Sequence, residues 1–400
     1  MLILITQPLD SRNRSRYALD YWVGIADKVT ILDLTHLLYP LKSQYFSEQG
    51  GLLDISGLDY YSPCSIYECI YIIFTTSGQH KHYFDYANGG FFIEFIRLIL
   101  ASLQLRRIKI LNGLLPQKLR LVNKNYFYSI SSTILKLKKY SLAQLVSKFA
   151  ENLLIRTRNF IVKSDFYVAT SDGCLNLIPN SISKKNIIHA CSFDYDIYLD
   201  SLRSVSTLNN SITNTAVFLD GDLCYHPDFL TSDSNCPVSV ESYYPAINNF
   251  LKLTEKKLNL NVIIAAHPRS NYSDEKIANT YPGFEVVSHK TAELIKNCAV
   301  VFTHDSTAVS FACLYGKPIV FLVTDELLND GRNGYLDGMI NYLGGQVINL
   351  DDVVDVPNDF LMGDIGFAES SNNYINEFVK CSIADPTKKS HEIISDVLMI

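Results

Sequence analysis

The sequence has little charge and no apolar run long enough to cross a membrane. Charged residues make up 19% of its 400 residues and hydrophobic residues 48%, a balance that is typical of a folded protein and excludes a disordered chain. The longest apolar-rich window, 91–105, is interrupted by Glu94 and Arg97. The apolar N-terminus lasts only about five residues, which is too short for a secretory signal. These absences predict a cytoplasmic globular protein.

Cysteine never occurs in the paired spacing of a metal or redox motif. The nine cysteines are scattered along the chain, no two of them are separated by two residues, and their number is odd. This pattern argues against a disulfide framework and predicts reduced thiols, as found in a cytoplasmic compartment.

Motifs that mark several common enzyme classes are also missing. The sequence has no GxxxxGK[ST] loop, no GxGxxG after its first apolar run, no HExxH and no GxSxG. It therefore lacks the signatures of P-loop nucleotidases, common dinucleotide enzymes, zinc proteases and serine hydrolases.

Short apolar runs alternate with segments of helical periodicity along the chain, which predicts an α/β fold with parallel sheets covered by helices. A polar stretch at 204–214 predicts a linker between two Rossmann-like domains, 1–203 and 215–384, whose sheets we expect to face each other across a cleft. A helix is expected at 385–400, and one option is that this helix packs back against the first domain. The expected strands are 2–5, 29–32, 70–74, 108–111, 166–169 and 187–190, then 216–220, 262–266, 284–287, 300–303, 319–323 and 346–350.

Charge is distributed unevenly along the chain. Between Arg106 and Lys163 there are thirteen Lys or Arg residues and one acid, Glu151, a local charge of +12 in a chain whose net charge is -6. One interpretation is a solvated helical face, and the other is a surface for anionic lipid head groups. Nucleic acid is not an expected partner, because no recognised binding module accompanies the segment.

Ligands bind beyond the carboxyl ends of strands in open α/β sheets, so polar residues that follow each expected strand are candidates for chemistry. His267 and Arg269 follow the run at 262–266. A guanidinium and an imidazole presented together suit a phosphate group. Lys290 and Thr291, after 284–287, are candidates for a second part of the same ligand. A structural turn and a helix cap are the alternative interpretations.

The run at 300–303 leads into His304, Asp305, Ser306 and Thr307 before an apolar helical spacing resumes. Helix capping needs only one hydroxyl and does not account for the five consecutive polar residues Thr303 to Thr307. Free N–H groups at a helix start bind anions, and adjacent hydroxyls add donors. We therefore expect Ser306 and Thr307 to hold a phosphate, while His304 and Asp305 either contact the nucleotide or hold the turn.

The run at 216–220 ends in Asp220, followed by Gly221 and Asp222. A carboxylate at a strand end beside a glycine suits a general base, and an Asx turn is the structural alternative. An Asp-x-Asp spacing also occurs in divalent-metal sites, but three residues are a weak signal and we expect no metal. His226 lies in a stretch rich in turn formers and is assigned a structural role.

The order of these motifs resembles that of bacterial sialyltransferases and related CMP-sugar transferases of the GT-B fold. Those enzymes carry an acidic residue before glycine, a His-Pro pair and a Ser/Thr pair, which correspond to 220–221, 267–268 and 306–307. The stretches FLDGDLCYHPDF, VIIAAHPRSNY, KTAELIKN and HDSTAVSFACLYGKPIVFL are also similar to surface-polysaccharide biosynthesis proteins. The resemblance covers residues 187–325.

The resemblance implies an inverting, metal-independent glycosyltransferase without a cofactor. Its donor would be a CMP-linked acidic sugar, either Kdo or a nonulosonic acid such as sialic, pseudaminic or legionaminic acid. Its acceptor would be a glycan or lipid-linked glycan of bacterial capsule, lipopolysaccharide or other surface glycan, at the inner face of the membrane. The alternatives are a polyol-phosphate transferase of the CDP-glycerol type and an inactive nucleotide- or glycan-binding assembly protein.

The resemblance also implies a role for each motif. Asp220 would be the general base, and His267 would contact the donor phosphate and assist the departing CMP. The family has two acids before the glycine, whereas here Asp222 follows it, so Asp222 is the alternative base. The remaining candidates on the donor side are Arg269, His304, Ser306, Thr307, Lys290 and Thr291.

The acceptor side is expected in the first domain. Polar residues that follow the expected strand at 70–74 are the candidates there, although they also suit a simple turn. They are Thr75, Thr76, Ser77 and Gln79.

Overall fold

The computed structural model describes residues 1–7, 9–39, 55–116, 142–161, 165–203, 214–226, 236–268, 270, 272–330, 334–357 and 366–399. They divide into two compact units. Unit 1 contains the described residues of Met1–Leu115, Val122–Cys191 and Ile383–Ile400, and unit 2 contains those of Pro116–Leu121 and Ser192–Ser382. No helix in the described part of the chain is long and apolar enough to cross a membrane. None of the nine cysteines, all of which lie in the described ranges, forms a disulfide bond.

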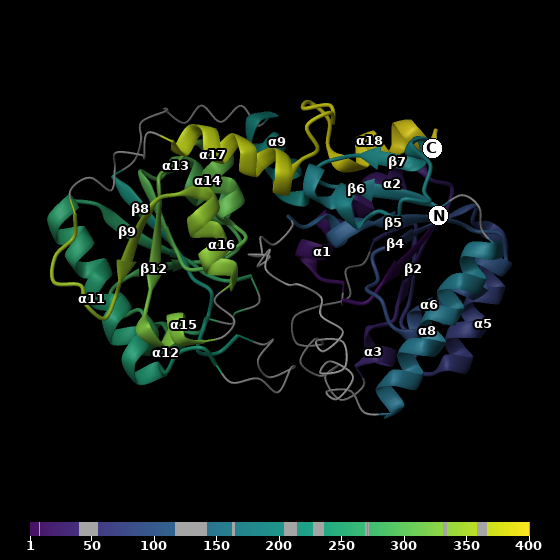
Figure 1. Cartoon of the computed structure of the whole chain (residues 1–400), viewed down its shortest axis with the longest axis horizontal. Coiled ribbons are helices and arrows are strands. Elements are labelled where there is room, and N and C mark those ends of the chain that lie inside the picture. The colour runs from purple at the N-terminus through teal and green to yellow at the C-terminus, as the bar shows by residue number, and fades with distance from the viewer. Residues whose placement is uncertain are drawn as a thin grey trace, which may run out of the picture. The chain divides into compact units, whose positions relative to one another are not determined.

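Unit 1 is built on a parallel sheet of seven strands in the order β3-β2-β1-β4-β5-β6-β7 (Figure 1). Its central strands are buried on both faces, which explains why they are short continuous apolar runs. The strands are β1 Leu2–Ile5, β2 Val29–Asp33, β3 Leu58–Tyr61, β4 His82–Asp85, β5 Arg106–Ile110, β6 Phe166–Ala169 and β7 Ile187–His189.

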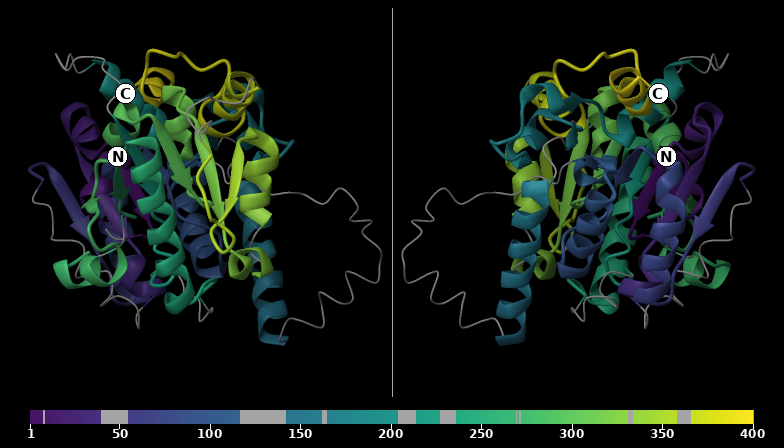
Figure 2. Two further views of the ribbon diagram at one scale, coloured as in Figure 1. Left: turned by 90° about the vertical axis from the view of Figure 1, so that its left-hand side faces the viewer. Right: turned by 90° about the vertical axis from the view of Figure 1, so that its right-hand side faces the viewer.

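Helices cover the sheet of unit 1. Two of them, α6 and α8, pack against each other and lie side by side in the right view of Figure 2. The C-terminal helix α18 belongs to this unit, where Ser390 Oγ donates to the carbonyl of Cys191 at 2.8 Å. The helices are α1 Ser11–Arg16, α2 Leu19–Ile25, α3 Thr35–Leu38, α5 Ile66–Thr76, α6 Phe91–Ser102, α8 Leu142–Ile161 and α18 Ser390–Leu398.

Unit 2 contains a parallel sheet of six strands in the order β10-β9-β8-β11-β12-β13. All six strands predicted for the second domain are present, with ends that shift by one residue at most, and the left view of Figure 2 shows this side of the molecule. The strands are β8 Thr215–Leu219, β9 Asn261–Ala265, β10 Glu285–Val287, β11 Val300–Thr303, β12 Ile319–Val323 and β13 Gln346–Asn349.

The helices of unit 2 begin before the predicted linker. Helix α9, Phe193–Arg203, belongs to unit 2, because Ser310 Oγ on α14 donates to the carboxylate of Asp194 and Lys296 Nζ donates to the carbonyl of Ser201 at 2.8 Å. The other helices are α11 Val240–Leu258, α12 Asp274–Thr280, α13 Thr291–Asn297, α14 Val309–Tyr315, α15 Asp325–Asn329, α16 Gly334–Leu343 and α17 Phe367–Tyr374, followed by a π-helical turn at Ile375–Val379.

One predicted strand is wrong. The run at 70–74 belongs to helix α5, in which Cys69, Ile72, Ile73 and Thr76 are buried. This spacing of three and four residues places their side chains on one helical face toward the core. Strands β3 and β4 were not predicted, because their sequences, LDYY and HYFD, mix apolar with polar residues.

Each sheet has a point at which the strand order reverses. It lies between β1 and β4 in unit 1 and between β8 and β11 in unit 2. Loops diverge there beyond the carboxyl ends of the two strands, and ligands of open α/β sheets bind in that place.

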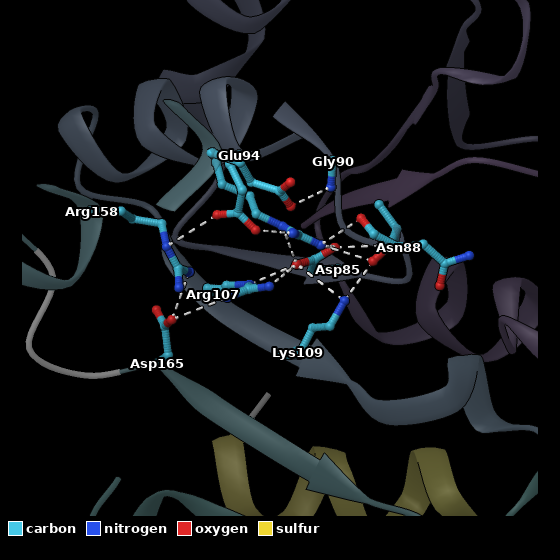
Figure 3. A network of polar contacts seen from close by, with 11 residues as sticks. Asp85, Asn88, Gly90, Glu94, Arg107, Lys109, Arg158 and Asp165 are labelled. Atoms are coloured by element: carbon cyan, nitrogen blue, oxygen red, sulfur yellow. Dashed lines mark hydrogen bonds and ion pairs between the residues drawn. The ribbon is translucent and has the colours of Figure 1, made fainter. Parts of the chain in front are cut away.

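A buried network of ion pairs joins α6 and α8 to the sheet of unit 1 (Figure 3). Asp85, the last residue of β4, accepts hydrogen bonds from Arg97 Nε at 2.9 Å and Arg107 Nε at 2.6 Å. Arg158 on α8 donates to Asp165 at 2.9 Å. Burial opposes ionisation of Asp85, but the Arg107 and Arg97 cations more than offset it and hold the pKa of Asp85 well below its usual range.

This network changes the interpretation of the basic segment 106–163. Arg107 and Arg158 are buried, and Lys109 is largely buried with Nζ donating to the carbonyl of Ala87 at 2.5 Å. Burial lowers the pKa of Lys109 to about 8. Three of the thirteen cations therefore contribute to the interior of unit 1 and not to a surface. Seven of the others, at 118, 120, 124, 136, 138, 139 and 163, lie outside the described residues.

Candidate functional site

Asp220 lies at the switch point of unit 2, where protein donors occupy both of its carboxylate oxygens. Oδ1 accepts hydrogen bonds from the hydroxyl of Tyr281 and from the backbone N–H of Asp222, both at 2.9 Å, and Oδ2 accepts one from the hydroxyl of Tyr272. The side chain is buried, and this burial raises the pKa of Asp220. The bond from Asp222 closes an Asx turn, so Asp220 anchors the loop that leaves β8.

Asp222 has left-handed backbone geometry, with φ of 49°. Its carboxylate accepts a hydrogen bond from Ser270 Oγ at 2.7 Å and forms an ion pair with Lys276 at 3.0 Å. The ammonium of Lys276 also lies over the rings of Tyr225 and Tyr272, at 5.1 and 4.4 Å from their centroids. The second acid is therefore already neutralised by a cation of the protein.

The contacts of Asp220 and Asp222 occupy the oxygens that a metal ion at the Asp-Gly-Asp sequence would need. A divalent cation there would have to displace Lys276 from Asp222 and the tyrosine hydroxyls from Asp220. Within the described ranges, no group of three His, Cys, Asp or Glu side chains is placed to hold a metal ion.

His267, at the carboxyl end of β9, lies against His226, which follows β8. Their Nε2 atoms are 3.4 Å apart and their ring centroids 4.5 Å apart. Both rings are partly exposed. Adjacent strands carry the two loops, because Leu219 at the end of β8 pairs with Ala265 at the end of β9. His226 was assigned a structural role from the sequence, and the signal that identifies it is a second His-Pro dipeptide after a buried strand.

His304 does not face a ligand. It is 1% exposed, with Nδ1 bonded to the carbonyl of Leu322 at 2.6 Å and Nε2 to the hydroxyl of Tyr243 at 2.9 Å. Because a carbonyl only accepts, Nδ1 donates, and in the neutral ring Nε2 then accepts from the hydroxyl of Tyr243. Burial lowers the pKa of His304. The expectation that His304 binds the donor is therefore corrected: it fixes the turn after β11.

Ser306 and Thr307 lie between β11 and α14 and are both partly exposed. Ser306 Oγ accepts the N–H of Ala308 at 3.3 Å, which is a local turn contact. Lys290, which is exposed, and Thr291 stand at the start of α13, after the edge strand β10. These residues share the carboxyl edge of the sheet with the two histidines: β11, which precedes Ser306 and Thr307, neighbours β8, and β10, which precedes Lys290 and Thr291, neighbours β9. Arg269 lies outside the described residues.

The four acceptor-side candidates lie at the wrong edge of the unit 1 sheet. Thr75 and Thr76 form the last turn of α5, and Ser77 to Gln79 form the 3₁₀ turn that leads into the amino end of β4. The hydroxyls of Thr75 and Thr76 bond to carbonyls of their own helix. Since ligands of parallel sheets bind at carboxyl ends, these residues are better explained as a helix terminus.

The arrangement suits the transfer of a group that is attached to a phosphate. Two adjacent imidazoles can hold or exchange one proton, and partly exposed hydroxyls of a neighbouring strand end can donate to phosphate oxygens. The buried Asp220 and Asp222 hold the loops in place.

Comparisons with known proteins show which solved structures share this fold. No family model and no curated protein matches the chain. The wall teichoic acid polymerase TagF matches with 11% identity and a TM-score of 0.53, over 100% of this chain and 89% of that chain. A histidine-substituted form of TagF matches with 10% identity and a TM-score of 0.51 over the same shares. The glycosyltransferase SnogD from Streptomyces nogalater matches with 10% identity and a TM-score of 0.47, over 98% of each chain. The TagF similarity shows the fold alone, and the predicted two-domain GT-B fold is confirmed.

Proposed function

We propose that this protein is a glycosyltransferase that moves an acidic sugar from a CMP-linked donor to a hydroxyl of a glycan acceptor. The proposal is supported by the GT-B fold, by the motif order and by the chemistry gathered at the switch point of unit 2. The observation that carries it is the contact between His226 and His267, because it provides two proton-handling groups at the sheet edge that also carries Ser306 and Thr307.

In the proposed reaction, the acceptor hydroxyl oxygen attacks the anomeric carbon from the face opposite the phosphate, so the configuration is inverted. The bond between the anomeric carbon and the phosphate oxygen breaks, and its electron pair leaves with CMP. His226 takes the acceptor proton, while His267 donates a hydrogen bond to the departing phosphate. Ser306 and Thr307 donate to its other oxygens, which stabilises the negative charge that develops there.

This assignment moves the general base away from the acids predicted from the sequence. Asp220 is buried and accepts three hydrogen bonds, and Asp222 is paired with Lys276, so neither carboxylate is presented to an incoming hydroxyl. His226 is partly exposed and follows the same strand as Asp220. In the proposal, the acids organise the loops and the imidazoles move the proton.

A panel of donors tests the proposal. Purified protein is incubated with CMP-sugars, CDP-glycerol and UDP-sugars together with glycan acceptors, and products are identified by mass. We expect turnover with a CMP-linked nonulosonic acid or Kdo. Transfer of glycerol phosphate would show that the protein is a polyol-phosphate transferase. Turnover with UDP-sugars alone would reject the CMP donor. CMP binding without turnover would indicate an inactive binding protein.

We also propose peripheral contact with an anionic membrane. Helix α8 exposes Val146, Phe149 and Leu153 on its solvent side, next to the exposed cations Lys148 and Arg156. An apolar stripe flanked by cations is typical of helices that lie in a membrane interface. Flotation with anionic and neutral vesicles at low and high salt tests this contact, which is rejected if anionic vesicles fail to bind at low salt.

A further inference from the structure

The buried arginines of unit 1 differ in whether a carboxylate balances their charge. Among the described residues of this unit four arginines are buried, and Arg97, Arg107 and Arg158 each lie within 3 Å of a carboxylate. Figure 3 shows Arg107 and Arg158 in the network with Asp85 and Asp165. The fourth, Arg16, forms no ion pair with any described residue, although it is only 5% exposed. A buried guanidinium without a carboxylate is costly, so its retention calls for an explanation.

Neutral groups hold Arg16 in place. Its Nη2 donates to Gln7 Oε1 at 3.0 Å and to the hydroxyl of Tyr17 at 2.6 Å, and the guanidinium carbon lies 4.7 Å from the centroid of the Tyr17 ring. Its Nε is buried and makes no hydrogen bond. Nε and Nη2 form one edge of the guanidinium, the edge that binds a carboxylate or phosphate through two parallel bonds. Nε makes no hydrogen bond, and Nη2 donates to the partly exposed Gln7 as well as to Tyr17.

Arg16 lies at the switch point of the unit 1 sheet. It is the last residue of α1, the helix that follows β1. The adjacent Tyr17 contacts Tyr86, which follows β4, with ring centroids 4.5 Å apart. The guanidinium therefore stands at the carboxyl ends of β1 and β4, the place in this kind of sheet where ligands bind.

We infer that Arg16 is the centre of an oxyanion-binding site in unit 1, which takes a carboxylate or phosphate group of a ligand. The oxyanion displaces the Gln7 amide and receives both Nε–H and Nη2–H. It supplies the direct ion-pair partner that Arg16 lacks among the described residues, whereas the carboxylates of Asp10 and Asp33 act on the neighbouring Tyr17 at longer range. Identification of this ligand as the acceptor rests on the proposed function, whereas the anion site itself does not.

Titration with inorganic phosphate, against chloride at constant ionic strength, tests the site. The protein has one tryptophan, Trp22, buried in α2 three residues beyond Leu19, so its fluorescence reports on unit 1. The titration is done in a His267→Asn background to remove phosphate binding in unit 2. We expect Arg16→Met to weaken the response by about tenfold or more, because it removes a charge-assisted, two-bond contact. Arg14→Met, on the exposed Arg14–Asp20 pair of the same helix, is the matched control and should respond as the parent does.

Stability separates a ligand site from a structural role. If Arg16 serves a ligand, Arg16→Met should match or exceed the parent in melting temperature, because an uncompensated charge is removed. A loss as large as that of Arg97→Met, or an unchanged phosphate response, would overturn the inference. Should Arg16→Met fail to fold, Gln7→Ala decides: it removes the competing acceptor and should tighten phosphate binding, and weaker or equal binding contradicts the site. Donor turnover by the wild-type protein tests the proposed function separately.

Discussion

The Nε2 atoms of His226 and His267 lie 3.4 Å apart, although 41 positions separate the two residues in the sequence. At this distance one ring donates a proton to the other, or the two rings share one proton with a ligand. Protonation of both would place two positive charges side by side, and an adjacent anion such as a phosphate would stabilise that state. The pair therefore suits a site in which a phosphate arrives and a proton moves.

Replacement of either histidine by asparagine should lower turnover by at least about a hundredfold, the usual scale for loss of acid–base catalysis. Because the two rings act as a unit, His226→Asn combined with His267→Asn should cost little more than one change alone. Initial rates with saturating donor measure both effects. His391→Asn, on α18 of unit 1, is the control that should keep full activity.

Substitutions of Asp220 test whether it anchors the loop after β8 or acts as the general base. Asp220→Asn keeps an oxygen that can accept the N–H of Asp222, so the Asx turn should persist and activity should fall by less than about tenfold. Asp220→Ala removes the turn contact and leaves the hydroxyls of Tyr272 and Tyr281 without their hydrogen-bond acceptor. It should therefore lower both stability and activity. If Asp220→Asn loses as much turnover as the histidine variants, Asp220 is the general base after all.

The network around Asp85 should dominate the stability of unit 1. Asp85→Asn leaves Arg97 and Arg107 buried without their shared carboxylate and should reduce the free energy of unfolding by about 3–5 kcal/mol. Asp59→Asn breaks the exposed pair with Lys28 and serves as the control, with little expected effect. Urea unfolding followed by circular dichroism measures both, and similar effects of the two changes would argue against the network as a source of stability.

His304 should make stability depend on pH. Its folded pKa is lowered by burial, so below its ordinary value of about 6.5 the unfolded chain binds a proton that the native protein excludes. The free energy of unfolding should therefore hold above about pH 6.5 and fall as the pH drops below it. His304→Gln should flatten this dependence, as measured by urea unfolding between about pH 5 and 8. An equally steep fall in the variant would assign it to other groups.

Much of unit 2 could be predicted because its strands are buried on both faces and read as continuous apolar runs, as Val300–Thr303 and Ile319–Val323 show. The same rule found β1, β2, β5, β6 and β7 of unit 1 but failed at one other run. The run at 70–74 is equally apolar, but it is one face of a helix, and short apolar runs do not distinguish the two. Strand β4 ends in Asp85, whose burial depends on arginines distant in sequence.

The candidate site, like the fold, could be predicted from the sequence only in part. The position of Asp220 at a strand end was predictable, because parallel strands place their carboxyl ends at one edge. That its oxygens would be occupied by Tyr272 and Tyr281 depends on residues more than 50 positions away. The burial of His304 and the contact of His226 with His267 likewise follow from strand order, which local sequence does not reveal.

The most direct test of the central claim is phosphorus NMR of the purified protein with a CMP-linked nonulosonic acid and a glycan acceptor. The account predicts that CMP appears at the rate at which sugar is transferred, and that His226→Asn and His267→Asn each slow both by at least about a hundredfold. A wild-type protein that leaves the CMP donor intact while it consumes another activated donor, or histidine variants as fast as wild type, would contradict it.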